Sequence, residues 1–335
     1  MSYRRAVIKA HGGPEVLEIR EEPVLPEPGP GQVRVKTLAA GVAFTDLMIR
    51  QGDYPGLKEK PPFTPGYDLV GEIDRVGPGV KDFAVGDRVA ELTVVGAQAE
   101  YVCLEAEDLV RVPSELDPAE AVSLVLAYTT AYQMLTRTAE VEAGERILVH
   151  GAGGAVGTAL VQLGKYLGLE VYGTASRPKH TLVTGLGARP IDYQRVDFVR
   201  VIQDLEEPGV DAVFDHLGGD HFQRSFKSLR EGGRLVAYGF YKAAMDRGGS
   251  AAVDFLRLFS WNLLPNGKSA QFYSIAPWRK KHPGWFREDL EHLFTLCGQG
   301  DLQPVIGKRI SLDELKEAHR WIAKARTQGK IVLCF

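Results

Sequence analysis

Three glycines at regular spacing lie in residues 150–157, which read His-Gly-Ala-Gly-Gly-Ala-Val-Gly. They follow an apolar segment typical of a strand and open a segment whose apolar residues keep helical spacing. Glycines in this pattern allow a tight turn, a close approach of the backbone to a diphosphate, and phosphate binding at the helix N-terminus. A turn that merely ends a strand is the alternative. Together, strand, turn and helix predict a dinucleotide site, to which we assign Gly151, Gly153, Gly154, Ala155, Val156 and Gly157.

The residues after the next expected strand indicate which dinucleotide is bound. NAD sites usually place an acidic side chain about twenty residues after the turn, where it binds the ribose 2′-hydroxyl. Here residues 174–180 read Thr-Ala-Ser-Arg-Pro-Lys-His, without an acid. Because Arg177 and Lys179 could donate charge-assisted hydrogen bonds to a 2′-phosphate, the sequence predicts NADPH. The alternative is that both residues belong to an ordinary solvated loop.

The elements that position these residues change in kind along the chain. Short alternating segments at residues 32–38, 69–76 and 88–92, separated by glycine and proline turns, predict a compact β region that we expect to be a partly open barrel. From about Pro118, helical segments alternate with expected strands, which predicts an α/β doubly wound parallel sheet. These strands are residues 146–150, 170–174, 212–215 and 234–238.

Composition and charge exclude several classes of protein. The chain has 335 residues, enough for two or three domains, with 44% hydrophobic and 25% charged residues, as in an average globular protein. A formal charge of −3 offers no basic field for nucleic acid. The three cysteines are far apart in sequence, and we find neither a signal peptide nor an apolar run of about 18 residues. We therefore expect a cytoplasmic protein without a transmembrane segment.

The order of these motifs resembles the medium-chain dehydrogenase/reductase superfamily, specifically its zinc-independent quinone oxidoreductases and, among these, the VAT-1-like branch. The resemblance covers nearly the whole chain. The motifs that carry it include FTDLMIRQGDY, TPGYDLVGEIDRVGPGV, AYTTAY, ILVHGAGGAVG, GTASRPKH, PIDY, VDAVFDHLGG, LVAYG and GKIVL.

The resemblance implies a GroES-like catalytic domain that encloses a Rossmann domain, with catalysis in the cleft between them. We place the first part of the catalytic domain at residues 1–122, the NADPH-binding domain at 123–265, and an edge strand plus the return to the catalytic domain at 266–335. It also implies a homodimer formed through an edge strand, for which residues 269–275 are the candidate.

The same comparison predicts that metal is absent. Zinc-dependent relatives hold a catalytic zinc with a Cys shortly before a Thr/Ser-Asp pair and with the His of a Gly-His-Glu run. This chain has Ala43 and Tyr67 at the matching positions. A methyl group and a phenol do not replace thiolate and imidazole as zinc ligands.

Without a metal, the acceptor must be electrophilic, so a quinone or a conjugated carbonyl compound is the expected small-molecule substrate. Tyr54 matches a family tyrosine that faces the cleft. Its neutral phenol could donate a proton to the substrate. Tyr67 is a second catalytic candidate, and packing is the alternative for both tyrosines. Asp46 is a third candidate, although we expect it to order its loop rather than donate protons.

Further residues are assigned through the resemblance. Thr130 matches a threonine near the nicotinamide, with a hydroxyl bonded to its own helix as the alternative, and Tyr193 matches a tyrosine beside the adenosine phosphate. We expect His216 to be a hydrogen-bonded histidine at the edge of the site rather than a base. Arg326 and Lys330 could contact the cofactor, but we expect both to be solvated. The cofactor residues are completed by Ser176, Gly218 and Gly239.

The leading hypothesis is therefore an NADPH-dependent, zinc-free oxidoreductase acting on quinones or conjugated carbonyl compounds. A 2-enoyl thioester reductase is the alternative among enzymes. A VAT-1-like nucleotide-binding adaptor with little catalytic activity is the alternative from another class.

Overall fold

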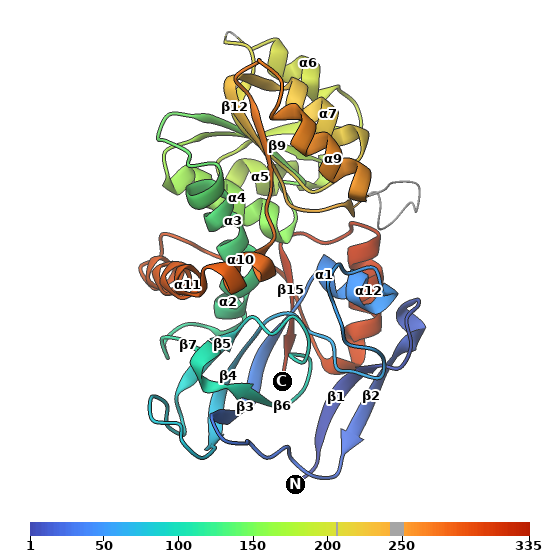
Figure 1. Cartoon of the computed structure of the whole chain (residues 1–335), viewed down its shortest axis with the longest axis vertical. Helices are drawn as coiled ribbons and strands as arrows, with labels where there is room; N and C mark the ends of the chain where they lie inside the picture. The colour runs from blue at the N-terminus through green and yellow to red at the C-terminus, as the bar shows by residue number, and fades with distance from the viewer. Residues whose placement is uncertain (206, 242–250) are drawn as a thin grey trace. The chain divides into compact units, whose positions relative to one another are not determined.

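A computed structural model describes residues 1–205, 207–241 and 251–335 of this chain, which form two compact units (Figure 1). The first unit combines residues 1–129 with residues 284–335, and the second consists of residues 130–283. Both ends of the chain thus belong to one unit, and the expected α/β segment forms the other.

The first unit contains a seven-stranded sheet with the order β14-β15-β3-β4-β5-β7, in which β6 also pairs with β3, and a separate hairpin of β1 and β2. Its β-rich, GroES-like architecture confirms the expected fold. The last strand, β15, pairs antiparallel with β3, so the C-terminal segment shares a sheet with strands near the N-terminus. The strands are β1 (Tyr3–Ile8), β2 (Leu17–Glu22), β3 (Gln32–Val42), β4 (Leu69–Val76), β5 (Arg88–Glu91), β6 (Tyr101–Glu105), β7 (Val110–Arg111), β14 (Ile306–Ile310) and β15 (Lys330–Cys334).

The first helix of this unit, α1, contains the catalytic candidate Asp46. Helix α1 ends at Gly52, whose φ of 84° is the left-handed conformation that glycine adopts most readily. The carboxylate of Asp117 accepts hydrogen bonds from two backbone N–H groups at the start of α2 and caps it. The helices are α1 (Phe44–Gln51), α2 (Pro118–Ser123), α11 (Pro283–Gly298) and α12 (Leu315–Ala323), and π-helical turns occupy Leu124–Tyr128.

The second unit is a six-stranded parallel sheet with the order β10-β9-β8-β11-β12-β13, the order of a Rossmann fold. The expected strands all form, although the expected edge strand is shorter than predicted, because it ends at Phe272 and Ile275 begins a helix. The strands are β8 (Arg146–His150), β9 (Glu170–Ala175), β10 (Arg189–Asp192), β11 (Val210–Asp215), β12 (Leu229–Ala237) and β13 (Ser269–Phe272).

The helices of the second unit connect these strands and cover the sheet (Figure 1). Strands β8 and β11 are almost wholly buried, as is usual for a parallel sheet covered on both faces. They are adjacent, and the chain continues from them toward opposite edges, so their carboxyl ends mark the point where ligands bind in such sheets. The helices are α3 (Thr129–Gln133), α4 (Ala155–Tyr166), α5 (His180–Gly185), α6 (Phe198–Gln203), α7 (Asp220–Lys227), α9 (Ala251–Trp261) and α10 (Ile275–Lys281), with π-helical turns at Met134–Thr138.

Candidate functional site

The predicted glycine turn joins β8 to α4 at the switch point of the sheet. Gly151 has a φ of 66°, and Gly154 is the N-cap of α4. A Cβ atom at Gly157 would lie 2.1 Å from the carbonyl oxygen of Gly151. Only glycine at that position therefore allows the helix to pack this closely on the turn.

Thr174, at the carboxyl end of β9, binds the first two N–H groups of the turn. Its hydroxyl accepts the N–H of Gly151 at 3.2 Å, and its carbonyl oxygen accepts the N–H of Ala152 at 3.0 Å. The first N–H groups of α4, around Ala155 and Val156, have no acceptor within the helix. They form the part of the turn that suits a diphosphate.

The two predicted basic residues, Arg177 and Lys179, lie directly after the end of β9. Ser176 precedes a single 3₁₀ turn, Arg177–Lys179, and no acidic side chain stands there. A Cβ atom at Gly153 would lie 2.7 Å from Cδ of Lys179, so the lysine side chain packs against the glycine turn. Burial lowers the pKa of Lys179, whereas Arg177 is exposed. A ligand phosphate near this turn would meet both cations.

Two further candidates lie in the loops after β11 and β12, and His216 joins one of them to the turn. Gly218 and Gly239 follow these strands, and a Cβ atom at Gly239 would lie 3.1 Å from the carbonyl oxygen of His216. The ring of His216 lies over the turn, because a Cβ atom at Gly151 would be 2.7 Å from its Cε1 atom. Burial lowers the pKa of His216, and the Tyr238 hydroxyl lies 3.4 Å from its Nδ1 atom.

Two assigned cofactor residues stand apart from these contacts. Tyr193 is 53% exposed and follows β10. Thr130 is nearly buried in α3. No described contact joins either residue to the glycine turn, so their roles stay predictions.

In the first unit, two of the three catalytic candidates form a pair. The hydroxyl oxygens of Tyr54 and Tyr67 are 2.5 Å apart, and the rings meet edge to face. Tyr67 is 1% exposed and Tyr54 is only partly buried, so Tyr54 is the member that a ligand can contact. Burial raises the pKa of Tyr54, and the hydrogen bond with Tyr67 opposes this rise.

The third catalytic candidate, Asp46, lies at the start of α1. Its carboxylate accepts the backbone N–H of Ala43 at 2.7 Å, an arrangement that orders the loop before the helix. Burial raises the pKa of Asp46 to about 7, and the hydrogen bond from Ala43 opposes the rise. The geometry therefore matches the expectation that Asp46 orders its loop.

An unexpected feature of this unit is a buried ion pair between Lys330 and Asp68. The Lys330 Nζ atom lies 2.9 Å and 3.3 Å from the two carboxylate oxygens of Asp68. The expectation that Lys330 is solvated is wrong, because the side chain is 2% exposed. Gly41, on the strand between them, leaves the space that both charged groups occupy. Arg326, by contrast, is exposed as expected.

The residues at the zinc-ligand positions do not fit a catalytic zinc. Ala43 offers only a methyl group, and the hydroxyl of Tyr67 is engaged with Tyr54. Among the described residues, one buried group has the composition of a metal site: His150, Asp215 and His221. The hydroxyl of Ser225 already lies among their ligand atoms, 2.6 Å from Asp215 Oδ2 and 3.0 Å from His150 Nε2.

Comparison with known families identifies both parts of the chain. Residues 29–114 match the family described as alcohol dehydrogenase GroES-like domain, and residues 186–333 match the family described as zinc-binding dehydrogenase. The first match lies within the first unit, whereas the second begins in the second unit and ends in β15 of the first. The second matched segment does not include Ala43 or Tyr67, the residues at the catalytic zinc positions.

Several proteins are similar to the chain over almost its full length. A quinone oxidoreductase of Pseudomonas aeruginosa is 34% identical, covering 98% of this chain and 99% of the relative. A 2-haloacrylate reductase of Burkholderia is 32% identical, covering 98% of both. The human synaptic vesicle membrane protein VAT-1 homolog is also 32% identical, covering 98% of this chain and 86% of the relative.

Solved structures show the same similarity in three dimensions. The quinone oxidoreductase of Escherichia coli in complex with NADPH has a TM-score of 0.87 at 26% identity, covering 99% of this chain and 100% of that one. The mycobacterial protein Rv1454c in complex with NADPH has a TM-score of 0.88 at 29% identity, with the same coverage. Both structures contain NADPH, so this cofactor is used among the chain's structural relatives.

Proposed function

Because this chain belongs to the medium-chain dehydrogenase/reductase family, with the quinone oxidoreductases and the VAT-1-like branch, we propose that it is a zinc-free reductase that transfers hydride from NADPH to quinones or activated conjugated carbonyl compounds. The observation that carries the proposal is the glycine turn with Lys179 packed against Gly153. This contact supports the proposal because a cation lies beside the turn that would bind the diphosphate, at the end of the strand where an NAD enzyme has an acid.

The substrate class follows from the first unit. NADPH supplies the hydride when bound, and the residues at the zinc-ligand positions provide no Lewis acid. The acceptor must therefore be polarised by its own structure, as in a quinone or an alkene conjugated to a carbonyl group. The names of two relatives, a quinone oxidoreductase and a 2-haloacrylate reductase, support such acceptors.

Tyr54 is the proposed proton donor. Its raised pKa keeps the phenol protonated at neutral pH, so it can hydrogen-bond a developing oxyanion and then protonate it. Tyr67 lies behind it and can donate its own proton to the Tyr54 oxygen as charge develops there. In this role Tyr67 positions and supports the donor.

Steady-state kinetics with NADPH and NADH test the cofactor assignment. In Arg177→Ala and Lys179→Ala variants, we expect the KM for NADPH to rise by a factor of about 10 to 100, the value of one charge-assisted hydrogen bond, with little change for NADH. Arg200→Ala, at an exposed arginine of the same unit, is the charge-matched control. Unchanged selectivity in both variants would refute the NADPH assignment.

Acceptor profiling separates the proposed activity from its alternatives. Oxidation of NADPH with 1,4-benzoquinone, 9,10-phenanthrenequinone, a haloacrylate and an enoyl thioester ranks the acceptor classes. Preference for the enoyl thioester would favour a 2-enoyl thioester reductase. Tight NADPH binding without turnover of any acceptor would favour the nucleotide-binding adaptor.

The assembly and location of the protein are part of the proposal. β13 lies at the edge of its sheet and pairs only with β12 among the described strands, so its other edge could pair with a second copy. Sedimentation equilibrium tests the proposed homodimer, and a monomer at all concentrations would refute it. The described residues contain no helix long and apolar enough to cross a membrane. We propose a cytoplasmic location, which fractionation can test.

A further inference from the structure

Four buried polar side chains connect the glycine turn to the carboxyl end of β11. Each comes from a different element of the second unit, and each is less than 5% exposed. We call them the Asp215 chain. Its members are Thr174 at the end of β9, His150 at the end of β8, Ser225 in α7 and Asp215 at the end of β11.

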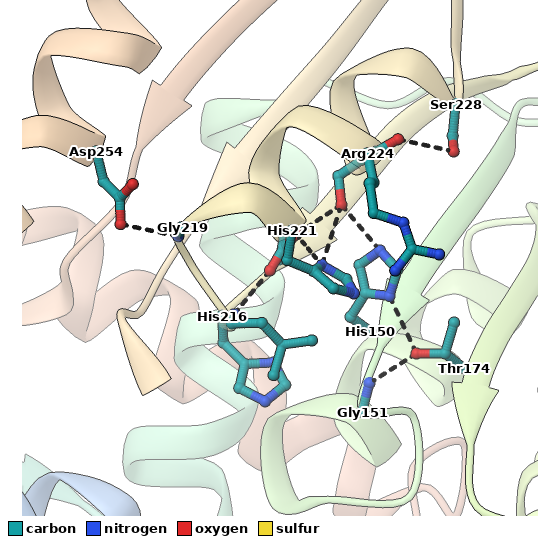
Figure 2. A network of polar contacts seen from close by, with 12 residues as sticks. His150, Gly151, Thr174, His216, Gly219, His221, Arg224, Ser228 and Asp254 are labelled. Carbon is teal, nitrogen blue, oxygen red and sulfur yellow. Dashed lines mark hydrogen bonds and ion pairs between the residues drawn. The ribbon is translucent and has the colours of Figure 1, made fainter. Parts of the chain in front are cut away.

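The hydrogen bonds of the Asp215 chain have one direction. Ser225 donates to Asp215 at 2.6 Å, so its oxygen accepts the Nε2–H of His150 at 3.0 Å. His150 Nδ1 is then unprotonated and accepts the hydroxyl proton of Thr174 at 3.0 Å. The Thr174 oxygen in turn accepts the N–H of Gly151 at 3.2 Å (Figure 2).

The opposite direction is unfavourable. If His150 carried its proton on Nδ1, Ser225 would have to donate to Nε2. The Ser225 oxygen would then face the Asp215 carboxylate at 2.6 Å without a proton between them. The observed geometry therefore selects one tautomer of His150.

Charge supports the same assignment. Burial holds the pKa of His150 well below its ordinary value, against the attraction of Asp215, so the ring stays neutral. Burial would raise the pKa of Asp215, but the hydrogen bond from His221, the attraction of the neighbouring histidines and the hydrogen bond from Ser225 together hold it below its usual range. An ionised carboxylate thus ends a chain of neutral groups.

Asp215 also fixes a second loop. Its Oδ1 atom accepts the N–H of Leu217 at 2.7 Å, at the start of the loop that contains Gly218. Through its two oxygens, one carboxylate holds this loop and, by way of the chain, the glycine turn. These loops follow β11 and β8, the adjacent strands at the switch point.

We propose that the Asp215 chain is a positioning device that presets the glycine turn for the diphosphate of the cofactor. Its members would set nucleotide affinity without contacting the nucleotide. This inference rests on the proposed function, because the ligand is taken to be NADPH.

Calorimetric titration with NADPH tests the role in binding. We expect Thr174→Val and Ser225→Ala each to weaken binding by about tenfold, since each breaks the chain at one hydrogen bond. The double variant should also lose about tenfold rather than a hundredfold, because both changes interrupt the same chain. Thr174→Ser keeps the hydroxyl and should restore binding to within about threefold of wild type.

A matched control and kinetics separate positioning from general damage to the fold. Ser228, the residue that follows α7, is also buried, but its hydroxyl donates to the Arg224 carbonyl oxygen and not to a member of the Asp215 chain. Ser228→Ala should bind NADPH as wild type does. In the chain variants, kcat at saturating NADPH should stay within about twofold of wild type, while the KM for NADPH rises.

The tautomer of His150 gives a readout independent of binding. Nitrogen-15 chemical shifts of the wild-type protein should show His150 protonated on Nε2 and neutral from pH 5 to 9. The charged and titratable groups acting on it are Asp215, His221, His216 and Arg224.

The outcomes are distinguishable. Protonation of His150 on Nδ1, or its titration in this pH range, would refute the proposed direction of the hydrogen bonds in the Asp215 chain. Wild-type binding that persists unchanged in both single variants would overturn its positioning role and leave the proposed function standing. Failure of wild-type protein to bind NADPH or NADP⁺ would instead remove the proposed function itself.

Discussion

Replacing Lys330 by methionine tests the buried ion pair of the first unit, because it removes the ammonium and keeps most of the length of the side chain. Lys330 and Asp68 are 2% and 0% exposed, and Nζ lies within 3.3 Å of both carboxylate oxygens. Removing one partner of such a pair leaves a buried charge without compensation, at a cost of about 3–5 kcal/mol. We expect this loss in the free energy of unfolding of the first unit at pH 8.

The loss should shrink at lower pH. Burial already raises the pKa of Asp68, against the attraction of Lys330. Without the lysine the pKa of Asp68 rises further, so the carboxyl group of the variant becomes neutral as the pH falls. The unpaired charge then disappears, and the difference from wild type should be smaller at pH 5 than at pH 8.

Native-state hydrogen exchange of the β3 amides measures the free energy of the opening that exposes the sheet of the first unit. Lys324→Met, at an exposed lysine, should change it by less than about 0.5 kcal/mol. Adding Asp68→Asn to Lys330→Met should recover part of the loss, because no buried charge remains. A loss below about 1 kcal/mol at pH 8, or additive losses in the double variant, would contradict the proposed compensation.

Three further predictions address the site directly. Since burial raises the pKa of Asp46 to about 7, folding takes up a proton between the unfolded pKa of 3.8 and pH 7, and the wild-type protein loses stability as the pH rises through this range. In urea unfolding at pH 5, 6 and 7, the free energy of unfolding of Asp46→Asn relative to wild type should therefore rise by about 1.4 kcal/mol per pH unit. Tyr54→Phe should lower kcat by about 10² to 10⁴ with a quinone, and Tyr67→Phe by less, whereas full activity of Tyr54→Phe would mean that water supplies the proton. Gly157→Ala should abolish NADPH binding in calorimetry, because the new Cβ atom would lie 2.1 Å from a carbonyl oxygen, while Gly185→Ala meets nothing within 4 Å and should bind normally.

Local signals made the fold and the glycine turn predictable. The apolar segment before Gly151 and the helical spacing after Gly157 are contiguous in sequence, so strand, turn and helix could be identified without knowledge of the rest of the chain. The same holds for the strands of the parallel sheet, which are apolar because both faces are buried. The edge strand was predicted too long, since Tyr273 and Ser274 continue its apolar and small character although α10 begins at Ile275.

Pairings between distant residues were not predictable in the same way. Lys330 and Asp68 are separated by 262 positions, and a lysine before an apolar strand is usually solvated. The Asp215 chain did leave a weak signal. His150, Thr174 and Asp215 are polar residues at the carboxyl ends of apolar strands, and three such ends meet at one edge of a parallel sheet. The contribution of Ser225 depends on how α7 packs, which the sequence does not specify.

Three buried carboxylates in this chain avoid an uncompensated charge in three ways. Asp68 has a cation beside it, Asp215 receives hydrogen bonds from Ser225, His221 and a backbone N–H, and Asp46 receives one from the backbone N–H of Ala43. Asp215, which receives three hydrogen bonds, has a pKa below its usual range. Asp46, which receives one, has its pKa raised to about 7. Of these three carboxylates, Asp46 is therefore the one expected to change its charge near pH 7. Its ionisation raises the pKa of Tyr54, so the proposed proton donor holds its proton more strongly as the pH rises through 7.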